Sequence, residues 1–485
     1  LVGSETLNLS GTGSVANANV ASNKTVTLGT LALADNSGLA ANYTLSGGTH
    51  QLTVNQRPLA ATIARQYDGT KTAAGSDLSS FDALQGGETL TLSGSGTVGD
   101  ENVANGQAVI LGTLALVDGT GLASNYSLNS ASLNITERVL NSSGSKTYDA
   151  NTNALAADIT LSNLVSGEAL NHSGTASISS ANAGSYTITN LAGITIADGS
   201  GGTASNYTLT GGTHNFTVNR RIVSVSGTRL YDATTNAIAS DLSTHTNLVG
   251  SETLNLSGTG TIASKNVGSN KTVSVGTLTL ADGSNGGLAA NYTLSGGTHQ
   301  LTVNQRPLNA IIQRVYDGGL NAEESDLSSF DALQGGETLF LSGTGTVSNK
   351  NVSSNQSVTL GTLALSDTGA TGDTANYSLN STKLNIVQRP ISTVYLTKLY
   401  DASTTVQASD LQTMTNLVGS ETLTLTGTST ISDANVGVKT VNTGGFTLND
   451  QAGANASSGG LASNYILSGG THQLTINQRP LNATL

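Results

Sequence analysis

The chain has 485 residues, of which 10% are charged and 58 are glycine, and it carries a net charge of −12 and no cysteine. The negative charge argues against nucleic acid as a partner, because phosphates need a basic surface. The lack of cysteine excludes disulfides, thiolate metal sites and a catalytic thiol. Gly, Ser, Thr and Asn dominate; they are poor helix formers and suit short strands joined by tight turns. No apolar run approaches the ~20 residues of a membrane span, so we expect no span in this segment.

Three short phrases recur along the chain, so internal repeats set its organisation. The first is a Gly-rich phrase ending in Glu-Thr-Leu or Glu-Ala-Leu, and its glutamate stands at Glu5, Glu88, Glu168, Glu252, Glu337 and Glu421. The second is Tyr-Asp-Gly/Ala, whose tyrosine stands at Tyr67, Tyr148, Tyr231, Tyr316 and Tyr400. The third is Asn-Tyr, which begins at Asn42, Asn125, Asn206, Asn291, Asn376 and Asn464. Successive copies lie roughly 83 residues apart.

Proline marks the joints between repeats. All four prolines stand in Arg-Pro pairs. Proline fixes φ and keeps the residue before it extended, so we expect the chain to pass from one repeat to the next with almost no linker. We predict a partial repeat at 1–56, complete repeats at 57–137, 138–220, 221–305, 306–388 and 389–478, and the start of a further repeat at 479–485. Because the chain begins in the middle of a repeat, we expect a longer protein on both sides.

Apolar and polar residues alternate within a repeat. In 57–137, Leu90 and Leu92 alternate with threonines, and Leu133 and Ile135 alternate just before the next joint. This period of two predicts strands with one buried face. Gly-, Asn- and Asp-rich breaks separate the strands, and we expect six or seven strands in each repeat.

Strands of this number and spacing favour a tandem array of immunoglobulin-like antiparallel β-sandwich modules. A β-grasp-like module is an alternative if residues 77–83 form a short helix. A β-solenoid is a further alternative, because Gly/Asn/Thr-rich chains often form one. Its rungs repeat at about 20–30 residues, and we find no such period within the repeats.

The recurring tyrosines could hold a sugar or a cation, but structural roles account for them better. We expect Tyr67 to end the first strand, with its ring on the core and its hydroxyl on a backbone partner. Asp68 should form a turn and accept local backbone N–H groups. We expect Asn42 to close a turn and Tyr43 to begin the next strand. Five of the six Asn-Tyr phrases also form Asn-x-Ser/Thr sequons, which leaves glycosylation open.

Four of the six histidines stand in the phrase Gly-Gly-Thr-His, at His50, His214, His299 and His472. One such histidine per repeat cannot build a multi-His metal site, and we interpret them as residues at hairpin tips. The loops that begin at Asp35, Asp118 and Asp282 offer oxygen ligands for Ca²⁺, but most carry one carboxylate and a good site needs several oxygens. We predict no metal site and no cofactor, with Ca²⁺ as the one metal that these loops could take.

Catalytic motifs are missing from the sequence. It contains no Gly-x-Ser-x-Gly elbow, no His-Glu-x-x-His and no phosphate-binding Gly-rich loop. An enzyme would rarely repeat the same acidic residue once in every unit. We predict that the protein is not an enzyme and has no catalytic or cofactor-binding residues.

The order Arg57-Pro58-Leu59, Tyr67-Asp68-Gly69, the phrase around Glu88 and Asn125-Tyr126 resembles the YDG-type repeat. That repeat is found in large bacterial surface and secreted proteins of the filamentous-haemagglutinin-like, two-partner-secretion class. The resemblance covers all five complete repeats and both fragments, although three copies have Ala in the third place of Tyr-Asp-Gly. It implies an exported all-β stalk of an adhesin or biofilm-matrix protein, located outside the cell or at the bacterial cell surface.

We therefore expect a semi-rigid rod of β-modules that holds a distal binding domain away from the cell. The alternative function is binding by the repeats themselves, either to polysaccharide or to another copy of the protein, through many weak contacts that add up. Exposed rows of aromatic residues would favour that alternative, and the sequence offers few aromatics beyond the recurring tyrosines.

Overall fold

The computed structural model describes residues 1–188, 191–451 and 459–482. These residues form short β-strands and 3-10 helices of three residues each, and the described part of the chain contains no α-helix. The prediction of an all-β protein is confirmed. Within the same residues, no helix has the length and apolar character needed to cross a membrane.

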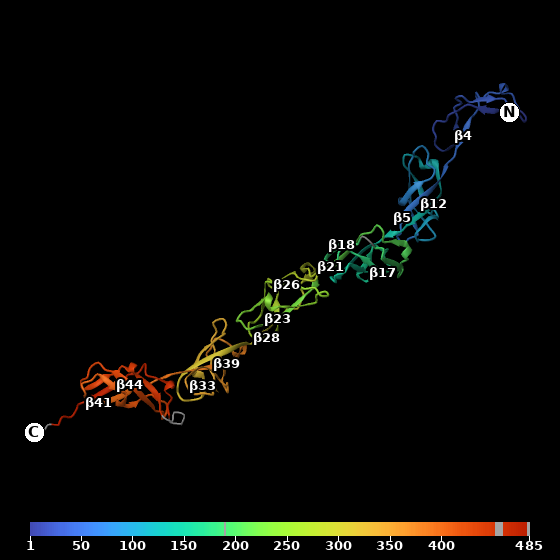
Figure 1. Ribbon diagram of the computed structural model, residues 1–485. Coiled ribbons are helices and arrows are strands. Elements are labelled where there is room, and N and C mark those ends of the chain that lie inside the picture. The colour runs from blue at the N-terminus through green and yellow to red at the C-terminus, as the bar shows by residue number, and fades with distance from the viewer. Residues whose placement is uncertain (189–190, 452–458, 483–485) are drawn as a thin grey trace. The chain divides into compact units, whose positions relative to one another are not determined.

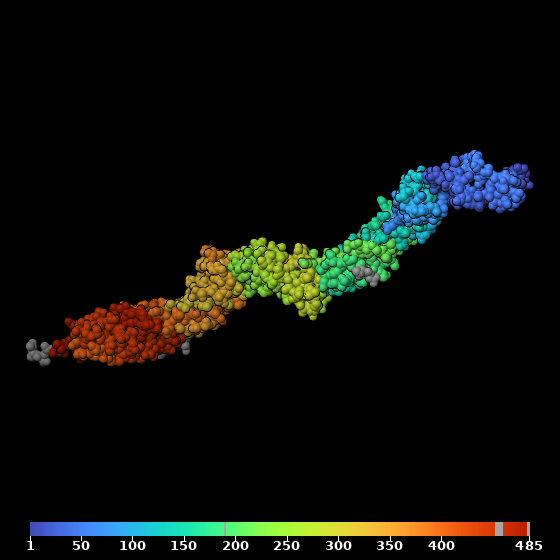
Figure 2. Space-filling model, turned by 90° about the horizontal axis from the view of Figure 1, so that it is seen from above, coloured from blue at the N-terminus to red at the C-terminus, as the bar shows by residue number. Residues whose placement is uncertain are grey.

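The chain divides into two compact units, Leu1–Arg221 and Ile222–Leu485. Within each unit, one repeat follows the next without intermixing, as the colours in Figure 2 show. In the described residues, each sheet draws its strands from a single repeat. This arrangement differs from a β-solenoid, in which sheets run on from one repeat to the next.

The first unit contains β1 (Asn8–Ser10), β2 (Ala21–Thr25), β3 (Ala32–Ala34), η1 (Ala40–Asn42), β4 (Gln51–Val54), β5 (Arg57–Gln66), β6 (Thr72–Ala74), η2 (Gly75–Asp77), β7 (Leu78–Phe81), β8 (Leu90–Ser93), β9 (Ser95–Thr97), β10 (Ala104–Ala108), β11 (Ala115–Asp118), η3 (Ala123–Asn125), β12 (Tyr126–Thr136), β13 (Arg138–Val139), β14 (Asn141–Thr147), β15 (Asn153–Leu155), η4 (Ala156–Asp158), β16 (Ile159–Ser162), β17 (Leu170–Ser177), β18 (Gly184–Thr187), β19 (Ile194–Asp198), η5 (Ala204–Asn206), β20 (Tyr207–Thr208) and β21 (His214–Asn219).

The next elements in chain order are β22 (Arg221–Ile222), β23 (Ser224–Leu230), β24 (Asn236–Ile238), η6 (Ala239–Asp241), β25 (Thr244–Thr246), β26 (Leu254–Ser257), β27 (Thr259–Ile262), β28 (Gly268–Ser274), β29 (Thr279–Asp282), η7 (Ala289–Asn291), β30 (Tyr292–Thr293), β31 (Gln300–Asn304), β32 (Arg306–Val315), β33 (Asn321–Glu323), η8 (Glu324–Asp326), β34 (Leu327–Phe330), β35 (Phe340–Ser342), β36 (Thr344–Thr346), β37 (Ser353–Ser357), β38 (Ala364–Ser366), η9 (Thr374–Asn376) and β39 (Tyr377–Val387).

The last elements are β40 (Arg389–Pro390), β41 (Val394–Leu399), β42 (Thr405–Gln407), η10 (Ala408–Asp410), β43 (Leu411–Met414), β44 (Leu423–Thr430), β45 (Gly437–Thr440), η11 (Thr443–Gly445), β46 (Phe446–Asp450), η12 (Ala462–Asn464), β47 (Tyr465–Ile466) and β48 (Gln473–Asn477).

The repeat 57–137 is built around a four-stranded sheet with the order β10-β12-β5-β7. Its central strands β5 and β12 are the first and the last strands of the repeat, and they lie side by side and run parallel (Figure 1). The outer strands β7 and β10 pair with them in the antiparallel sense. Two-stranded sheets, β11-β8 and β6-β9, complete the repeat.

The repeat 306–388 has the same plan, with β32 parallel to β39 at the centre of its four-stranded sheet. The repeats 138–220, 221–305 and 389–478 also pair their first long strand in parallel with their last strand. In 138–220 the last strand is interrupted between β20 and β21 by the segment that carries Gly-Gly-Thr-His. Gly211 has φ +84° in this segment, a backbone conformation that glycine adopts without strain.

Several details differ from the sequence-based expectations. The repeat 57–137 contains eight strands rather than six or seven, because its glycines divide the predicted strands into shorter pieces. Residues 75–77 form a 3-10 turn and residues 78–81 a strand, so the helix on which the β-grasp-like alternative depended is not found there. Pairing is not wholly antiparallel, because the first and last strands are parallel. The immunoglobulin-like strand arrangement stays a prediction.

The core of each repeat lies on the inner face of the central strands. Leu133 and Ile135 are buried, as their alternation predicted, and Leu59 and Ile63 are buried on β5 beside them. Ala61, between Leu59 and Ile63, is buried as well, whereas Ala60, Thr62 and Asn134 are half-buried. Pairing the two terminal strands thus places both ends of the repeat in one rigid sheet.

Candidate functional site

The junction between repeats 57–137 and 138–220 contains a carboxylate shared by two tyrosines. The hydroxyl of Tyr67 donates to Oε1 of Glu168 in the next repeat at 2.7 Å. The hydroxyl of Tyr207 donates to Oε2 of the same glutamate at 2.6 Å. The two rings meet edge to face, with centroids 5.4 Å apart, a favourable geometry for aromatic pairs. One side chain therefore binds two repeats together.

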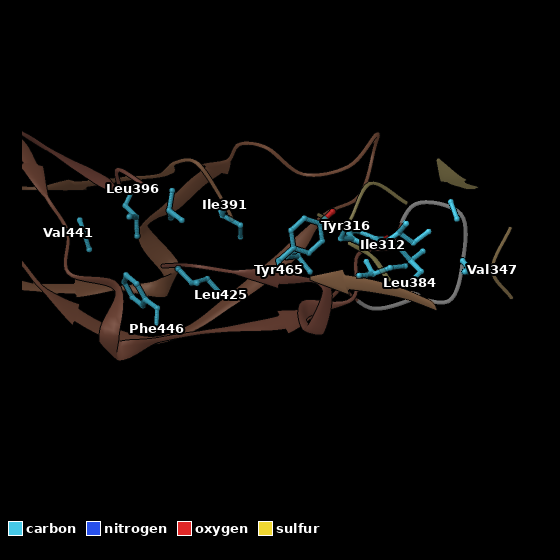
Figure 3. Close-up of a cluster of buried hydrophobic side chains, with 14 of the residues drawn as sticks. Ile312, Tyr316, Val347, Leu384, Ile391, Leu396, Leu425, Val441, Phe446 and Tyr465 are labelled. Atoms are coloured by element: carbon cyan, nitrogen blue, oxygen red, sulfur yellow. The ribbon is translucent and has the colours of Figure 1, made fainter. Parts of the chain in front are cut away.

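The same arrangement recurs at two further junctions within the second unit. Tyr231 and Tyr377 donate to the two oxygens of Glu337 at 2.7 and 2.8 Å. Tyr316 and Tyr465 share a third glutamate, and Figure 3 shows their rings next to each other in the middle of a hydrophobic cluster. We call each set of two tyrosines and one glutamate a Tyr–Glu–Tyr joint.

An asparagine forms a second bridge across the first of these junctions. Oδ1 of Asn206 accepts the backbone N–H of Val103 at 2.9 Å, and its Nδ2 donates to Oδ1 of Asn102 at 2.7 Å. Asn376 and Asn464 make equivalent pairs of bonds to the preceding repeat. Since these asparagines are buried, their side-chain amides form hydrogen bonds with the neighbouring repeat in place of water.

In the four complete repeats after 57–137, the arginine that opens the repeat reaches back to the Tyr-Asp tyrosine of the repeat before it. Arg138 donates to the carbonyl oxygen of Tyr67 at 3.4 Å and Arg389 to that of Tyr316 at 3.2 Å. Arg138 also donates to the backbone and side-chain oxygens of Asn163. The guanidinium group thus fixes the start of one repeat to the end of the first strand in the repeat before it.

Apolar side chains are continuous across the joints. One buried cluster contains Ile63, Tyr67 and Leu133 of repeat 57–137 together with Leu140 and Tyr207 of the next repeat. A second cluster runs through the repeats 306–388 and 389–478 (Figure 3). Two repeats that share one core cannot turn about their joint without exposing apolar surface to water.

The third residue of Tyr-Asp-Gly/Ala lies against the next repeat. Gly69 has φ +73°, and a Cβ added to it would lie 2.9 Å from Cγ1 of Val165. Gly318 faces Val418 in the same way, at 2.8 Å. Ala233 stands at the equivalent place in another joint, where it faces Gly335. Ala233 has the same left-handed backbone, with φ +63°, so this backbone also occurs with alanine, and what Gly69 and Gly318 share in addition is the close neighbouring valine.

Burial and the nearby carboxylate change the ionisation of the joint tyrosines. Burial and the hydrogen bond to Glu168 raise the pKa of Tyr207 to about 12. Burial also raises the pKa of Tyr377 to about 12, with a further contribution from Glu337. The neutral phenol is the form that can donate to the carboxylate, so each joint holds its tyrosines protonated.

The joint at Glu337 contains an additional cation. Nζ of Lys265 lies 2.6 Å from Oε1 of Glu337 and 5.8 Å from the centre of the Tyr231 ring. Burial alone would raise the pKa of Glu337, but the bonds from Lys265 and the two tyrosines outweigh it and hold that pKa below its usual value. Both oxygens of the carboxylate are occupied by donors of the protein, which suits a fastening between repeats rather than acid–base chemistry.

The sequence-based expectations for the tyrosines were right in part. Tyr67 is buried and directly follows the first strand, which ends one residue earlier, at Gln66. The expected backbone partner of its hydroxyl was wrong, because the hydroxyl binds Glu168. Asp68 accepts the N–H of Thr70 at 2.9 Å, which confirms the predicted turn. Asn42 closes a 3-10 turn, but Tyr43 begins no strand. In the complete repeat 57–137, the equivalent Tyr126 does begin a strand.

The structure corrects the interpretation of the Gly-Gly-Thr-His histidines as hairpin-tip residues. His214, His299 and His472 are buried. In His299, Nε2 pairs with the carbonyl oxygen of Leu294 at 2.9 Å and Nδ1 accepts the N–H of Val225 at 3.2 Å. The ring thus ties the segment that interrupts the last strand back to the first strand, which accounts for its occurrence only in the repeats that have this interruption.

The loops proposed for Ca²⁺ use their aspartates to hold 3-10 turns. Asp35, Asp118 and Asp282 each accept the N–H of the first residue of the following turn, at 2.6 to 2.8 Å. In the residues that the structure describes, no three or more His, Cys, Asp or Glu side chains gather where they could hold a metal ion.

The sequons fall on residues of the joints. Asn206 and Asn376 are buried with both ends of the amide bonded, so a glycan on either would need the joint to open. The partners Asn102 and Val103 were missed by sequence reasoning, which assigned them no role. The signal was present, because Asn-Val recurs once in most repeats, at Asn19, Asn102, Asn266, Asn351 and Asn435.

A comparison with family models identifies the repeats. The model described as the YDG domain matches five stretches, residues 48–135, 133–215, 216–301, 298–384 and 388–472. One match falls on each of the five expected complete repeats. No curated protein matches the chain.

Proposed function

This chain belongs to the YDG domain family, and from that premise we propose that its repeats form a semi-rigid spacer that holds a binding domain away from a surface. We place the spacer in a bacterial extracellular adhesin or biofilm-matrix protein, outside the cell or at the cell surface. The low content of charged residues and the absence of cysteine suit an exported protein. The resemblance to repeats of two-partner-secretion proteins supports the same location.

The observation that carries the proposal is the Tyr–Glu–Tyr joint. At three junctions a glutamate accepts hydroxyl groups from both of the repeats that meet there. The tyrosines are buried, and a buried polar group that loses its partner costs about 1–3 kcal/mol. Bending a joint far enough to separate the repeats would break the bond from Tyr67, Tyr231 or Tyr316, which is the one that crosses the junction, and so the joint resists bending.

The strands of neighbouring repeats also follow each other without a flexible connection. Between β4, which ends at Val54, and β5, which begins at Arg57, there are only Asn55 and Gln56. The side chain of Gln56 donates to the carbonyl oxygen of Ser124 in the next repeat at 3.1 Å. Short connections and shared cores together support a spacer whose repeats keep a fixed relation to their neighbours.

The alternative, in which the repeats themselves bind polysaccharide or another copy, receives less support. Sugar binding commonly uses exposed aromatic side chains, but six of the tyrosines are engaged in the joints. Of the exposed aromatics, Phe340 and Tyr395 do not recur at equivalent places in the other repeats, and Tyr400 is the Tyr-Asp-Ala tyrosine of the last complete repeat. We keep this function as an outcome of the test below.

Small-angle X-ray scattering of the full chain tests the spacer. We would compare the wild type with a triple variant, Glu168→Ala, Glu337→Ala and Glu421→Ala, which removes the acceptor from three joints. Glu137→Ala with Glu324→Ala serves as the control, because these glutamates lie outside the joints. We expect the triple variant to lose the defined distances between repeats, and the control and a calcium chelator to leave the wild-type profile unchanged.

Two results would contradict the proposal. One is a wild-type profile that already matches a freely jointed chain and does not change in the triple variant. The other is a molecular mass that grows with protein concentration at micromolar levels, which would favour self-association over a passive spacer.

A further inference from the structure

We propose that the parallel pair formed by the first and last strands of each repeat is a mechanical clamp that resists pulling along the chain. This inference rests on the proposed spacer function, because a spacer that links a surface to a bound target transmits force. It goes beyond that function, since a rigid joint need not resist tension. The geometry that points to it is the position of the two ends of a repeat.

Tension enters and leaves a repeat at opposite ends of the same strand pair. In the register of β5 and β12, Arg57 lies opposite Tyr126, and Thr136 lies opposite Gln66. The chain enters at Arg57 and leaves after Thr136. A force that separates these two points slides the strands along each other, so the interstrand bonds are loaded together rather than one after another.

The clamp is long in two of the repeats. β5 and β12 pair at ten positions, with one bulge between Leu128 and Ser130. β32 and β39 also pair at ten positions. The inner face of this strand pair adds the buried side chains of Ile63, Leu133 and Ile135. Sliding by one residue would also move those apolar side chains from the core to the solvent.

The clamp is shorter in the repeats that carry Gly-Gly-Thr-His. In 138–220, β13 and β20 pair at two positions, and β14 and β21 pair at six after an interruption. In 389–478 the corresponding pairs are two and five. We therefore infer an order of yielding, in which the interrupted clamps give way at lower force than the continuous ones.

The exit of the clamp is fixed by the joint. The N–H of Tyr67 donates to the carbonyl oxygen of Thr136 at 2.9 Å, directly after the last paired residues. The side chain of the same tyrosine holds Glu168 of the next repeat. Tension that arrives from the next repeat thus reaches the C-terminal ends of β5 and β12 together, through Tyr67.

Single-molecule force spectroscopy on the full chain tests the clamp, and the absence of native cysteine allows handles to be attached at chosen pairs of sites. Gln56→Cys with Glu137→Cys pulls repeat 57–137 in the sliding direction. Gln66→Cys with Glu137→Cys pulls the same strands apart from one end. Glu137→Cys with Arg220→Cys pulls the interrupted repeat 138–220 in the sliding direction. All four positions are exposed.

At one loading rate we expect a several-fold higher unfolding force for the first pair than for the second, with the third pair in between. Equal forces in the sliding and peeling directions would overturn the clamp, and so would a higher force for the third pair than for the first. Pulling the wild-type chain through terminal handles provides a readout that needs no internal substitution; unfolding of all repeats at the low force of the peeling direction would again overturn the proposal. Scattering tests the spacer separately, so a stiff array that yields at low force would contradict the clamp alone.

Discussion

The hydroxyl of Tyr316 donates a hydrogen bond of 2.7 Å to Glu421, which lies 105 residues further along the chain in the next repeat. The second oxygen of Glu421 accepts the hydroxyl of Tyr465 at 2.6 Å. One carboxylate therefore satisfies a buried hydroxyl from each side of the junction. If the repeats separate, Tyr316 loses its acceptor, whereas Tyr465 keeps Glu421 because both stand in the repeat 389–478. The glutamate that reaches across the junction is therefore the first position to test.

Replacing Glu421 by Gln should weaken the joint between repeats 306–388 and 389–478. An amide has one oxygen to accept with, so one of the two buried hydroxyls loses its partner, at a cost of about 2 kcal/mol. The backbone N–H of Val418, which donates to the hydroxyl of Tyr465, reports on this loss. Its hydrogen exchange should accelerate roughly 30-fold for that free-energy change. Glu137→Gln, an exposed glutamate outside the joints, should leave the exchange rate of Val418 unchanged.

Acid should open the joint at Glu337, and Lys265 should set the pH at which it opens. The pKa of Glu337 is below its usual value of 4.5, so the stability that its charge contributes is complete above that pH and is lost as the pH falls through the lowered value. In Lys265→Met, loss of the cation raises the pKa of Glu337, and the joint should open at higher pH. The loss of stability at neutral pH should stay under about 1 kcal/mol because the lysine is partly exposed.

Hydrogen exchange of the residues around Tyr231 and Glu337, followed from about pH 6 to pH 2, measures this opening. Lys71→Met provides the matched control, because Lys71 forms an exposed ion pair with Glu101 at 3.4 Å away from the joint carboxylate. An acid transition at Glu337 that is the same with and without Lys265 would contradict the role assigned to the lysine.

Replacing Gly69 by Ala should destabilise the first Tyr–Glu–Tyr joint for two separable reasons. A left-handed backbone costs a residue with a Cβ about 1–2 kcal/mol, and the new methyl group would press on Val165, which adds about 1–3 kcal/mol. Gly86→Ala isolates the first effect, because Gly86 has φ +62° and no neighbour within 4 Å of an added Cβ. Calorimetry of the full chain measures both variants.

The steric part of this prediction can be reversed. Val165→Ala in the Gly69→Ala background makes room for the methyl group and should recover the stability that the contact removed. If Gly69→Ala and Gly86→Ala prove equally destabilising, the contact with Val165 contributes nothing to the choice of glycine at this position.

Replacing Asn206 by Ala should loosen the same joint while Tyr67, Glu168 and Tyr207 all stay in place. The substitution leaves the N–H of Val103 without its acceptor in a partly buried place, at a cost of about 1–3 kcal/mol. Asn42→Ala changes the same Asn-Tyr phrase where the asparagine is exposed and should have little effect. Limited proteolysis of the segment around residues 99–103 compares the two, and equal cleavage rates would argue against the asparagine bridge.

Local sequence patterns predicted much of the fold. Alternation of Leu133 and Ile135 with polar residues predicted the buried face of a strand, and both residues are buried. The turn at Asp68 was predicted because aspartate side chains accept hydrogen bonds from nearby backbone N–H groups, and the structure contains this turn. These features involve residues within a few positions of each other, where spacing in the sequence translates directly into direction in space.

Partners across the joints could not be predicted in the same way. Tyr67 and Glu168 are 101 residues apart, and their phrases recur in every complete repeat, so spacing alone cannot say whether a tyrosine meets the glutamate of its own repeat or of the next. The histidines show the same limit. A Gly-Gly-Thr-His phrase was interpreted as a hairpin tip, but in the structure it interrupts the last strand, and packing of this segment against the first strand buries His214 and His299.

The sequence by itself determined that this protein is an all-β array of about five complete repeats, because recurrence and period-two alternation are properties of the chain order. Tertiary structure alone decided that the first and last strands of each repeat run parallel, and that one glutamate fastens two tyrosines from neighbouring repeats. The reason is physical. Strand direction and hydrogen-bond partners depend on which distant surfaces come together to bury their apolar faces, and many pairings of short, similar strands satisfy the local pattern equally well.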